Sequence, residues 1–310
     1  MTVAPDVAAL LADEVTLGLP PLSSLSPAQA RAQDASLQLR RRAGVDLPLV
    51  SSAEDTVLAG MPVRVVTPLG AGPFPVVVHV HGGGWVLGSP DTYALVVRRL
   101  AVDIGAVVVD VDYRRAPEHP FPAGLDDCWA VLQEVASWGR PVAVTGDSGG
   151  GAIAAALTLR ARDAAVVIAA QLLVYPSVSL VRAWPSWREF RSGAGLDAAD
   201  SRWFADCWVP RVEDRADPLV SPYEAGSLVG LPAAVVAVAE VDPLRDGALA
   251  YAERLRADGV DTTVVIAKGQ VHGYLTMPGL VGGEQAVASA HRALRGLVVH
   301  KGAVGPLEPR

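Results

Sequence analysis

The chain has 310 residues, 51% of them hydrophobic, which is enough for one large α/β domain or two smaller ones. Its formal net charge of −7 argues against nucleic acid as the main partner. Two cysteines are too few for a disulfide framework. No signal peptide or membrane-spanning run is visible, so we expect a cytoplasmic location.

Apolar runs typical of strands alternate with amphipathic or apolar stretches typical of helices. Strands are predicted at 57–58, 62–66, 75–81, 106–113, 141–145, 167–174, 233–241 and 262–267. Helices are predicted at 6–16, 27–42, 91–103, 123–138, 152–159, 244–258 and 284–299, with a loose tail at 302–310. This order favours a mostly parallel sheet of about eight strands, the first two antiparallel, with helices on both faces.

One long segment, 183–225, contains no strand pattern and lies between two predicted core strands. Within it, residues 184–208 hold six of the chain's 17 aromatic residues: Trp184, Trp187, Phe190, Trp203, Phe204 and Trp208. Large rings bury much area, so we expect some of them to shape a compact apolar pocket. The alternative is that these rings only attach the segment to the core.

Residues 146–150, Gly-Asp-Ser-Gly-Gly, connect a predicted strand to a predicted helix. A G-x-S-x-G sequence in that context is typical of a nucleophile elbow, where the serine backbone is strained and its neighbours must lack side chains. Ser148 would then stand at a helix N-terminus with the Gly149 N–H free to bind an anion. The alternative, a glycine turn with an N-cap serine, is weakened by the flanking strand and helix.

A serine nucleophile needs a histidine base, which follows it along the chain in this architecture. His272, His291 and His300 are the candidates. His272 follows the last predicted strand, at the rim of the sheet where ligands gather. His291 lies on the apolar stripe of the last helix, which indicates a partly buried structural histidine.

The acid that orients the histidine should lie at the end of the preceding strand, 233–241. Glu240, Asp242 and Asp246 are available there. Asp242 stands directly at the strand end and is the favoured candidate, although it could also cap the following helix. Asp246 would fall in the first helical turn, a common place for a solvated acid.

Another glycine run, His81-Gly82-Gly83-Gly84-Trp85, follows a predicted strand. It lacks the Lys-Ser/Thr of a phosphate-binding loop. Its bare N–H groups, together with that of Gly149, could form an oxyanion hole. The alternative is a flexible glycine turn.

Five motifs, in order between residues 81 and 274, resemble the hormone-sensitive-lipase-like family of α/β-hydrolase carboxylesterases. They are His81-Gly-Gly-Gly-Trp85, Tyr113-Arg-Arg-Ala-Pro-Glu-His-Pro-Phe-Pro-Ala123, Gly146-Asp-Ser-Gly-Gly-Gly151, Asp242-Pro-Leu-Arg-Asp246 and His272-Gly-Tyr274. The departures from the family pattern are mild: Gly149 where alanine is usual, Arg115 where leucine is common and Gly247 in place of glutamate.

The resemblance implies an α/β-hydrolase fold with a helical cap. The core would comprise 47–182 and 226–301, and the cap 1–46 and 183–225. It also implies Ser148 as nucleophile, Asp242 as acid and His272 as base, with oxyanion donors at Gly82, Gly83 and Gly149. No metal or cofactor is implied.

The predicted function is therefore a serine carboxylesterase acting on short- to medium-chain acyl esters, of roughly two to eight carbons. The predicted substrate-binding rings are Trp85, Trp187, Trp203 and Trp208. A lipase, an amidase or a deacetylase of a specialised metabolite are alternatives on the same catalytic residues. A non-catalytic receptor of this fold is disfavoured because His272 is present.

The last predicted strand, 262–267, should lie at an edge of the sheet. It is apolar in its centre and charged only at its ends, at Asp261 and Lys268. Because an exposed apolar edge favours pairing with another strand, we expect a homodimer formed through it.

Overall fold

A computed structural model describes residues 2–301, and these contain one eight-stranded sheet in the order β1-β2-β4-β3-β5-β6-β7-β8. The strands are β1 Ser52–Leu58, β2 Met61–Thr67, β3 Val76–Val80, β4 Val107–Val111, β5 Val142–Asp147, β6 Ala170–Val174, β7 Ala233–Val241 and β8 Thr262–Val271. β2 pairs antiparallel with both β1 and β4, and every pair from β4 to β8 is parallel. The predicted strand number and the antiparallel start are confirmed.

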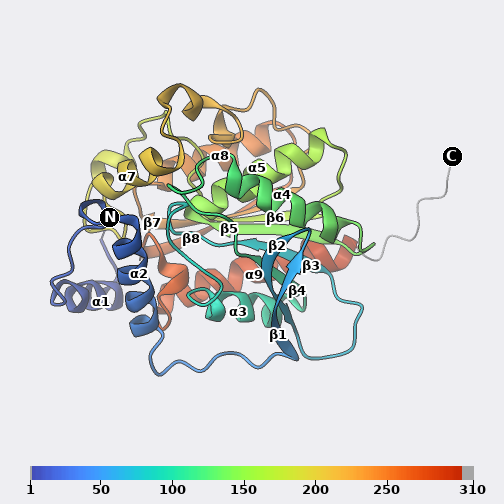
Figure 1. The fold of residues 1–310 in the computed structure, drawn as a ribbon, viewed down its shortest axis with the longest axis horizontal. Coiled ribbons are helices and arrows are strands. Elements are labelled where there is room, and N and C mark those ends of the chain that lie inside the picture. The colour runs from blue at the N-terminus through green and yellow to red at the C-terminus, as the bar shows by residue number, and fades with distance from the viewer. Residues whose placement is uncertain (1, 302–310) are drawn as a thin grey trace.

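The helices are α1 Pro5–Val15, α2 Pro27–Arg41, α3 Ala94–Ile104, α4 Ala123–Ala136, α5 Ser148–Asp163, α6 Ser186–Glu189, α7 Ala198–Trp208, α8 Arg245–Ala257 and α9 Val281–Lys301. Helices α4, α5 and α8 cover one face of the sheet, and α3 and α9 cover the other (Figure 1). This confirms the predicted three-layer arrangement. The predicted tail at 302–310 lies outside the described residues.

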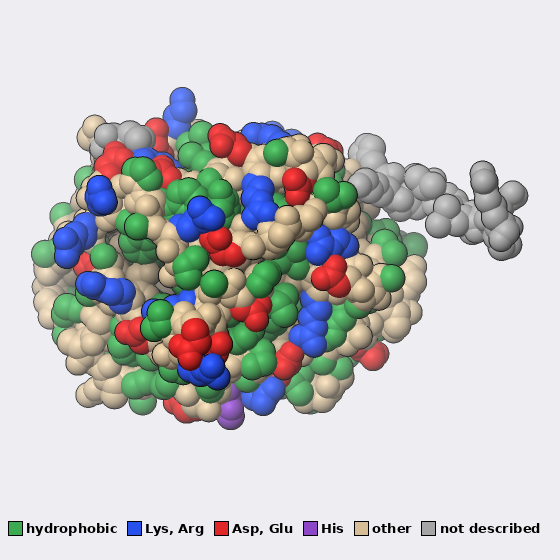
Figure 2. All heavy atoms as spheres, turned by 90° about the horizontal axis from the view of Figure 1, so that it is seen from above, with side chains coloured by type: hydrophobic (Ala, Val, Ile, Leu, Met, Phe, Trp, Pro, Cys, Tyr) green, Lys and Arg blue, Asp and Glu red, His purple; other side chains and the backbone are tan. Residues whose placement is uncertain are grey.

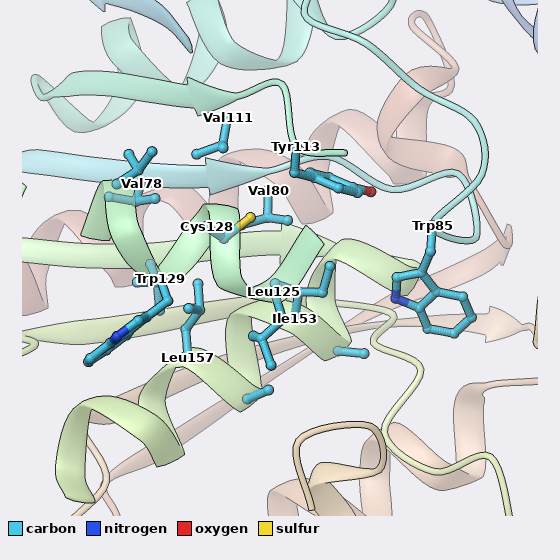
Figure 3. Packing of buried hydrophobic residues seen from close by; sticks show 14 of the residues in the cluster. Val78, Val80, Trp85, Val111, Tyr113, Leu125, Cys128, Trp129, Ile153 and Leu157 are labelled. Carbon is cyan, nitrogen blue, oxygen red and sulfur yellow. The ribbon is translucent and has the colours of Figure 1, made fainter. Parts of the chain in front are cut away.

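The central strands are apolar throughout because both of their faces are buried. Val76, Val78 and Val80 of β3 pack against α4 and α5, whereas Val77 points to the side of α3 and α9. Figure 3 shows the first of these clusters, with the thiol of Cys128 among its aliphatic side chains. Cys128 is a free and completely buried thiol of this core.

The N-terminal helices do not cover the sheet faces but lie beside α7 at one end of the molecule (Figure 1). Helix α2 begins where predicted, with a capping box in which Ser26 accepts from Gln29 N–H and Pro27 takes the first helical position. Its Arg31 donates to the carbonyls of Val86 and Ala116, both at 2.8 Å. These bonds fix α2 over the loop that follows β3.

Among residues 2–301, no helix is both long and apolar enough to cross a membrane.

Candidate active site

The turn between β5 and α5 has the strained geometry that the sequence predicts. Ser148 takes φ +54°, a left-handed conformation that costs energy for any residue with a side chain. A Cβ at Gly146 would lie 2.3 Å from the carbonyl oxygen of Gly150, and one at Gly150 would lie 2.2 Å from that of Val80. Glycine is therefore required on both sides of Ser148, where α5 starts directly at the end of its strand.

Ser148, His272 and Asp242 form an unbroken run of hydrogen bonds at the carboxyl ends of β5, β8 and β7. His272 Nε2 lies 2.9 Å from Ser148 Oγ, and His272 Nδ1 lies 2.8 Å from Asp242 Oδ2. An ionised carboxylate only accepts, so Nδ1 carries the proton and the Nε2 lone pair faces the serine hydroxyl. The arrangement orients His272 to take a proton from Ser148.

Both partners of the serine are buried and held by further bonds. Asp242 is completely buried, and its second carboxylate oxygen accepts from Leu244 N–H at 2.8 Å. The N-cap of α8 is Leu244, so Asp242 precedes the helix start but still satisfies one of its N–H groups. The backbone N–H of His272 donates to the carbonyl of Ala194 at 3.0 Å, which ties its loop to the 183–225 segment.

Three other candidates for base and acid are engaged elsewhere. His291 on α9 is buried, and its Nδ1 lies 2.7 Å from Asp103 Oδ2. Glu240 accepts from Gly269 N–H at 2.8 Å. Asp246 is not simply solvated, because it accepts from Ser186 N–H at 2.8 Å and so holds the start of α6.

The glycine run after β3 differs from the prediction at one position. The N–H of Gly82 donates to Asp147 Oδ1 at 2.9 Å and also lies 3.0 Å from the Tyr93 hydroxyl. It is therefore unavailable to a substrate, and the prediction of Gly82 as an oxyanion donor is corrected. The physical reason is that the buried Asp147 carboxylate needs donors and takes this one.

Three other glycines, Gly83, Gly84 and Gly149, line the cavity that contains Ser148. Within residues 2–301, the structure records no acceptor for their N–H groups. Gly84 follows Gly83 in the run predicted from sequence, but the pattern alone could not tell which members of the run are free.

Asp147 links the serine turn to the glycine run and to the histidine. Its Oδ2 accepts from the hydroxyls of Tyr93 at 3.0 Å and Tyr175 at 3.4 Å. The ring of Tyr175 in turn packs against that of His272, with 4.7 Å between centroids. Burial raises the pKa of Asp147, and the hydrogen bonds from the Tyr93 hydroxyl and the Gly82 N–H offset part of that effect.

The cavity in front of Ser148 has a volume of about 180 Å³. Its apolar lining comes from both the sheet rim and the helical segments: Leu22, Leu37, Trp85, Leu87, Leu196, Phe204, Leu244 and Met277. Pockets that hold drug-sized ligands are typically about 300–1,000 Å³, so this one suits a small ester.

The four predicted substrate-binding tryptophans separate into different roles. Trp85 lines the cavity, with its ring stacked on Trp208 at 4.0 Å between centroids. Trp208 is buried behind it, and neither Trp208 nor Trp203 lines the cavity, which corrects the prediction for both. Trp187 lines a neighbouring groove. Two aromatics that line the cavity are not among these four: Phe204, which lies over Gly84, and Tyr93.

The departure at Gly149 has a structural explanation. A Cβ at this position would lie 3.0 Å from Cε2 of Trp85, tighter than an ordinary van der Waals contact. The missing side chain allows the indole to approach the serine turn closely. The loop carrying Trp85, which leaves the carboxyl end of β3 (Figure 3), therefore packs directly on α5.

Helix α2 contributes a polar strip to the same cavity. Asp34, Gln38 and Arg41 lie on one helical face, and Asp34 accepts from Gln38 Nε2 at 3.2 Å. Arg41 forms a two-bond pair with Glu14 of α1, at 2.6 and 2.9 Å. Burial raises the pKa of Asp34, which has no ion pair of its own within residues 2–301.

Comparison with known proteins gives consistent matches. Residues 77–276 match a family model described as the α/β hydrolase fold. Esterase LipI of Mycobacterium tuberculosis is 43% identical over 237 residues, 72% of this chain and 71% of that protein. Carboxylesterase NlhH of the same species is 40% identical over 275 residues, 83% and 84% of the two chains. The crystal structure of a thermostable esterase from Pseudomonas putida ECU1011 matches with a TM-score of 0.91 at 33% identity, covering 96% of this chain and 98% of that one.

Proposed function

The chain belongs to the hormone-sensitive-lipase-like family of α/β-hydrolases and is a carboxylic ester hydrolase, and on this premise we propose that Ser148, His272 and Asp242 carry out the hydrolysis. The proposal is carried by the run of hydrogen bonds from Asp242 through His272 to Ser148 at the floor of the cavity. The three side chains come from three strands, which is the arrangement that a serine hydrolase needs.

In the first half of the reaction, Ser148 Oγ forms a bond to the ester carbonyl carbon while its proton moves to His272 Nε2. Asp242 holds the imidazole through Nδ1–H and stabilises its charged form. Both groups are buried, so water weakens this interaction little.

The negative charge that develops on the carbonyl oxygen is stabilised by the N–H groups of Gly83, Gly84 and Gly149. Gly149 is the second residue of α5, so the helix dipole adds to its effect. Loss of one such donor typically lowers kcat by about 10²–10³.

In the second half, His272 Nε2–H protonates the leaving alcohol oxygen as the carbon–oxygen bond breaks. Water then attacks the acyl group on Ser148, and His272 takes the proton from that water. The acid leaves, and the proton on His272 returns to Ser148 Oγ.

The preferred substrates are esters of short to medium acyl chains, with roughly two to eight carbons, because the cavity is small and α1, α2 and the 183–225 segment form a cap over the sheet rim. A lipase would need an open apolar face for long chains. A deacetylase of a specialised metabolite uses the same chemistry and is the second candidate. The polar strip on α2 offers hydrogen bonds to an alcohol that carries further polar groups.

The test is covalent labelling by a fluorophosphonate together with turnover of p-nitrophenyl butanoate. We expect the label on the peptide that contains Ser148. Ser148→Ala should abolish labelling and lower kcat by about 10⁴–10⁶. Ser137→Ala, an exposed serine at the end of α4, is the matched control and should leave both unchanged. Labelling of another serine, or near-normal turnover in Ser148→Ala, would overturn the assignment.

A homodimer through β8 is part of the same proposal. β8 is the last strand of the sheet, and Ile266 is 49% exposed on it. At its far end the edge is already occupied, because Ala4 N–H donates to the carbonyl of Gly269 at 2.9 Å. The stretch 262–267 is left to pair with its symmetry mate. The cytoplasmic location stays a prediction from sequence.

A further inference from the structure

A second hollow adjoins the active-site cavity, lined by residues from 177–182 and from the 183–225 segment. It has a volume of about 470 Å³ and shares Ser177 and Ser201 with the cavity that holds Ser148. The backbone N–H of Ser177 donates to the carbonyl of Ser148 at 3.1 Å, so the groove opens beside the nucleophile. A substrate bound at Ser148 can therefore extend into it.

The lining of this groove is strongly basic. Five arginines contribute to it, and no aspartate or glutamate does: Arg182, Arg188, Arg191, Arg202 and Arg215. Arg182 is paired with Glu224 and Arg215 with Asp206, each at 2.6 Å. The carboxylates that pair with these two arginines do not line the groove but offset their charge.

The remaining three, Arg188, Arg191 and Arg202, have no such partner. Across residues 2–301 the structure records neither an ion pair nor a side-chain hydrogen bond for any of them, and all three are exposed. Arg188 comes from α6 and Arg202 from α7, so two helices bring like charges to one groove. This occurs in a chain with a net charge of −7.

The position of the groove favours an anionic ligand. Figure 2 views the molecule from above; basic side chains lie at the left of this face, the end at which Figure 1 places α7, and others are spread over its centre and right among acidic ones. A concave site lined by one sign of charge concentrates ions of the opposite sign and raises their rate of association. Arginine also matches the planar geometry of a carboxylate or phosphate through paired N–H donors.

We infer that Arg188, Arg191 and Arg202 bind an anionic group of the ester substrate, so that the preferred ester carries a carboxylate or phosphate at the end of its acyl or alcohol chain. The inference rests on the proposed function and names its substrate class. The charged end would lie in the groove while the ester carbonyl faces Ser148. The side chain of Trp187, which also lines the groove, offers an apolar surface to the intervening methylenes.

The test compares esters that differ only in the terminal group: ethyl hexanoate, monoethyl adipate and ethyl 5-phosphonopentanoate. The quantity measured is the ratio of kcat/KM for each anionic ester to that for ethyl hexanoate. In the triple variant Arg188→Gln, Arg191→Gln, Arg202→Gln we expect this ratio to fall about tenfold, with kcat/KM for ethyl hexanoate nearly unchanged. Whichever of the two anionic esters shows the larger fall in this ratio identifies the anion, carboxylate or phosphonate, that the groove binds.

A charge-matched control separates a local effect from the overall change in charge. Arg140→Gln, Arg292→Gln, Arg295→Gln removes three exposed arginines that the structure places outside both hollows of the active site. It should leave the ratio within twofold of wild type. Raising the salt from 0.05 to 0.5 M should lower the ratio in wild type and in this control, but not in the groove variant. An equal fall in both triple variants, or an unchanged ratio in the groove variant, would overturn the inference.

Binding to the Ser148→Ala protein tests the groove independently of turnover. Calorimetry should show monoethyl adipate bound about tenfold more weakly when the three groove arginines are also replaced, and ethyl hexanoate unaffected. If wild type does not turn over these esters but the difference in binding is still seen, the proposed function is rejected and the inference about the groove stands. If wild type turns over ethyl hexanoate but replacing the three arginines does not change the binding of monoethyl adipate, the proposed function stands and the inference about the groove is rejected.

Discussion

The sheet side and the helical side of the active site are built in different ways. Ser148, Asp242 and His272 leave the ends of buried strands, and further bonds hold the two partners of the serine. The helical side includes short elements, such as the four-residue α6, and its groove is lined in part by exposed arginines. In the proposed mechanism, backbone geometry therefore positions the reacting groups, and in the proposed groove the exposed side chains select the ester. Substitutions should accordingly cost orders of magnitude on the first side and small factors on the second.

The largest contrast is expected between two histidines. Both are buried, and each holds an aspartate through Nδ1, at 2.8 Å for His272 and 2.7 Å for His291. His272→Ala should lower kcat by about 10⁴–10⁶, because base and nucleophile act as a unit. His291→Ala should change kcat little while lowering Tm. Steady-state kinetics on the two variants measures this difference. Equal losses of kcat would contradict the assignment of His272 as the base.

The next contrast lies within the glycine run. Gly84→Ala would place a Cβ 2.3 Å from the Phe204 ring at φ +58°, so the loop must shift and its N–H with it. We expect kcat/KM to fall about 10²-fold. Gly105→Ala, at φ +68° with open space around it, is the control for backbone strain alone. It should lower Tm and leave kcat/KM intact; a similar loss of activity in both variants would reject a role for the Gly84 N–H.

A smaller effect is expected where the helical side meets the cavity. Phe204→Ala should enlarge the cavity and move the preferred acyl chain length upward, with each newly accommodated methylene adding about 0.8 kcal/mol, or roughly fourfold in kcat/KM. Trp203→Ala removes the neighbouring ring, which does not line the cavity, and should leave the preference unchanged. Activity is measured on p-nitrophenyl esters from acetate to palmitate. An unchanged optimum in Phe204→Ala would show that its ring serves packing only.

A substitution on the edge strand β8 tests whether the sheet side of the molecule also forms the dimer interface. Ile266→Lys should convert the proposed dimer to a monomer, because a charge on an edge strand opposes pairing. Val102→Lys, at a 45% exposed position on α3, is the matched control and should leave the dimer intact. Light scattering at micromolar concentration reports the mass. A wild-type monomer, or a dimer that survives Ile266→Lys, would reject pairing through this strand.

The smallest effect concerns stability. Burial raises the pKa of Asp34, so between its ordinary value near 3.8 and the raised value the native state holds more protons than the unfolded state. Stability contributed by this group is therefore lost as pH rises through that range. Asp34→Asn should have a higher Tm than wild type at pH 7, and the difference should shrink toward pH 4. A variant less stable than wild type at pH 7 would show that the folded protein stabilises the ionised Asp34 carboxylate, for instance through the charge of Arg41.

Much of this protein follows from local sequence. Buried parallel strands must be apolar on both faces, so their runs and the alternating helices predict the sheet and its layers. The strained turn at Ser148 can only be built with glycines around it, which is why the pattern at 146–150 identifies it. His272 and Asp242 are located by the same logic, because chain order and strand ends leave few candidates.

Tertiary structure decided what depends on contacts between distant segments. Asp147 occupies Gly82 N–H, and only the folded distance of 2.9 Å reveals this, because every glycine of the run looks alike in the sequence. Likewise, the tryptophans of the 183–225 segment are equivalent by composition, but the stack of Trp208 on Trp85 buries one ring and leaves Phe204 to line the cavity. Periodicity reports which face of an element is buried, but it carries no information on which distant side chain packs against that face.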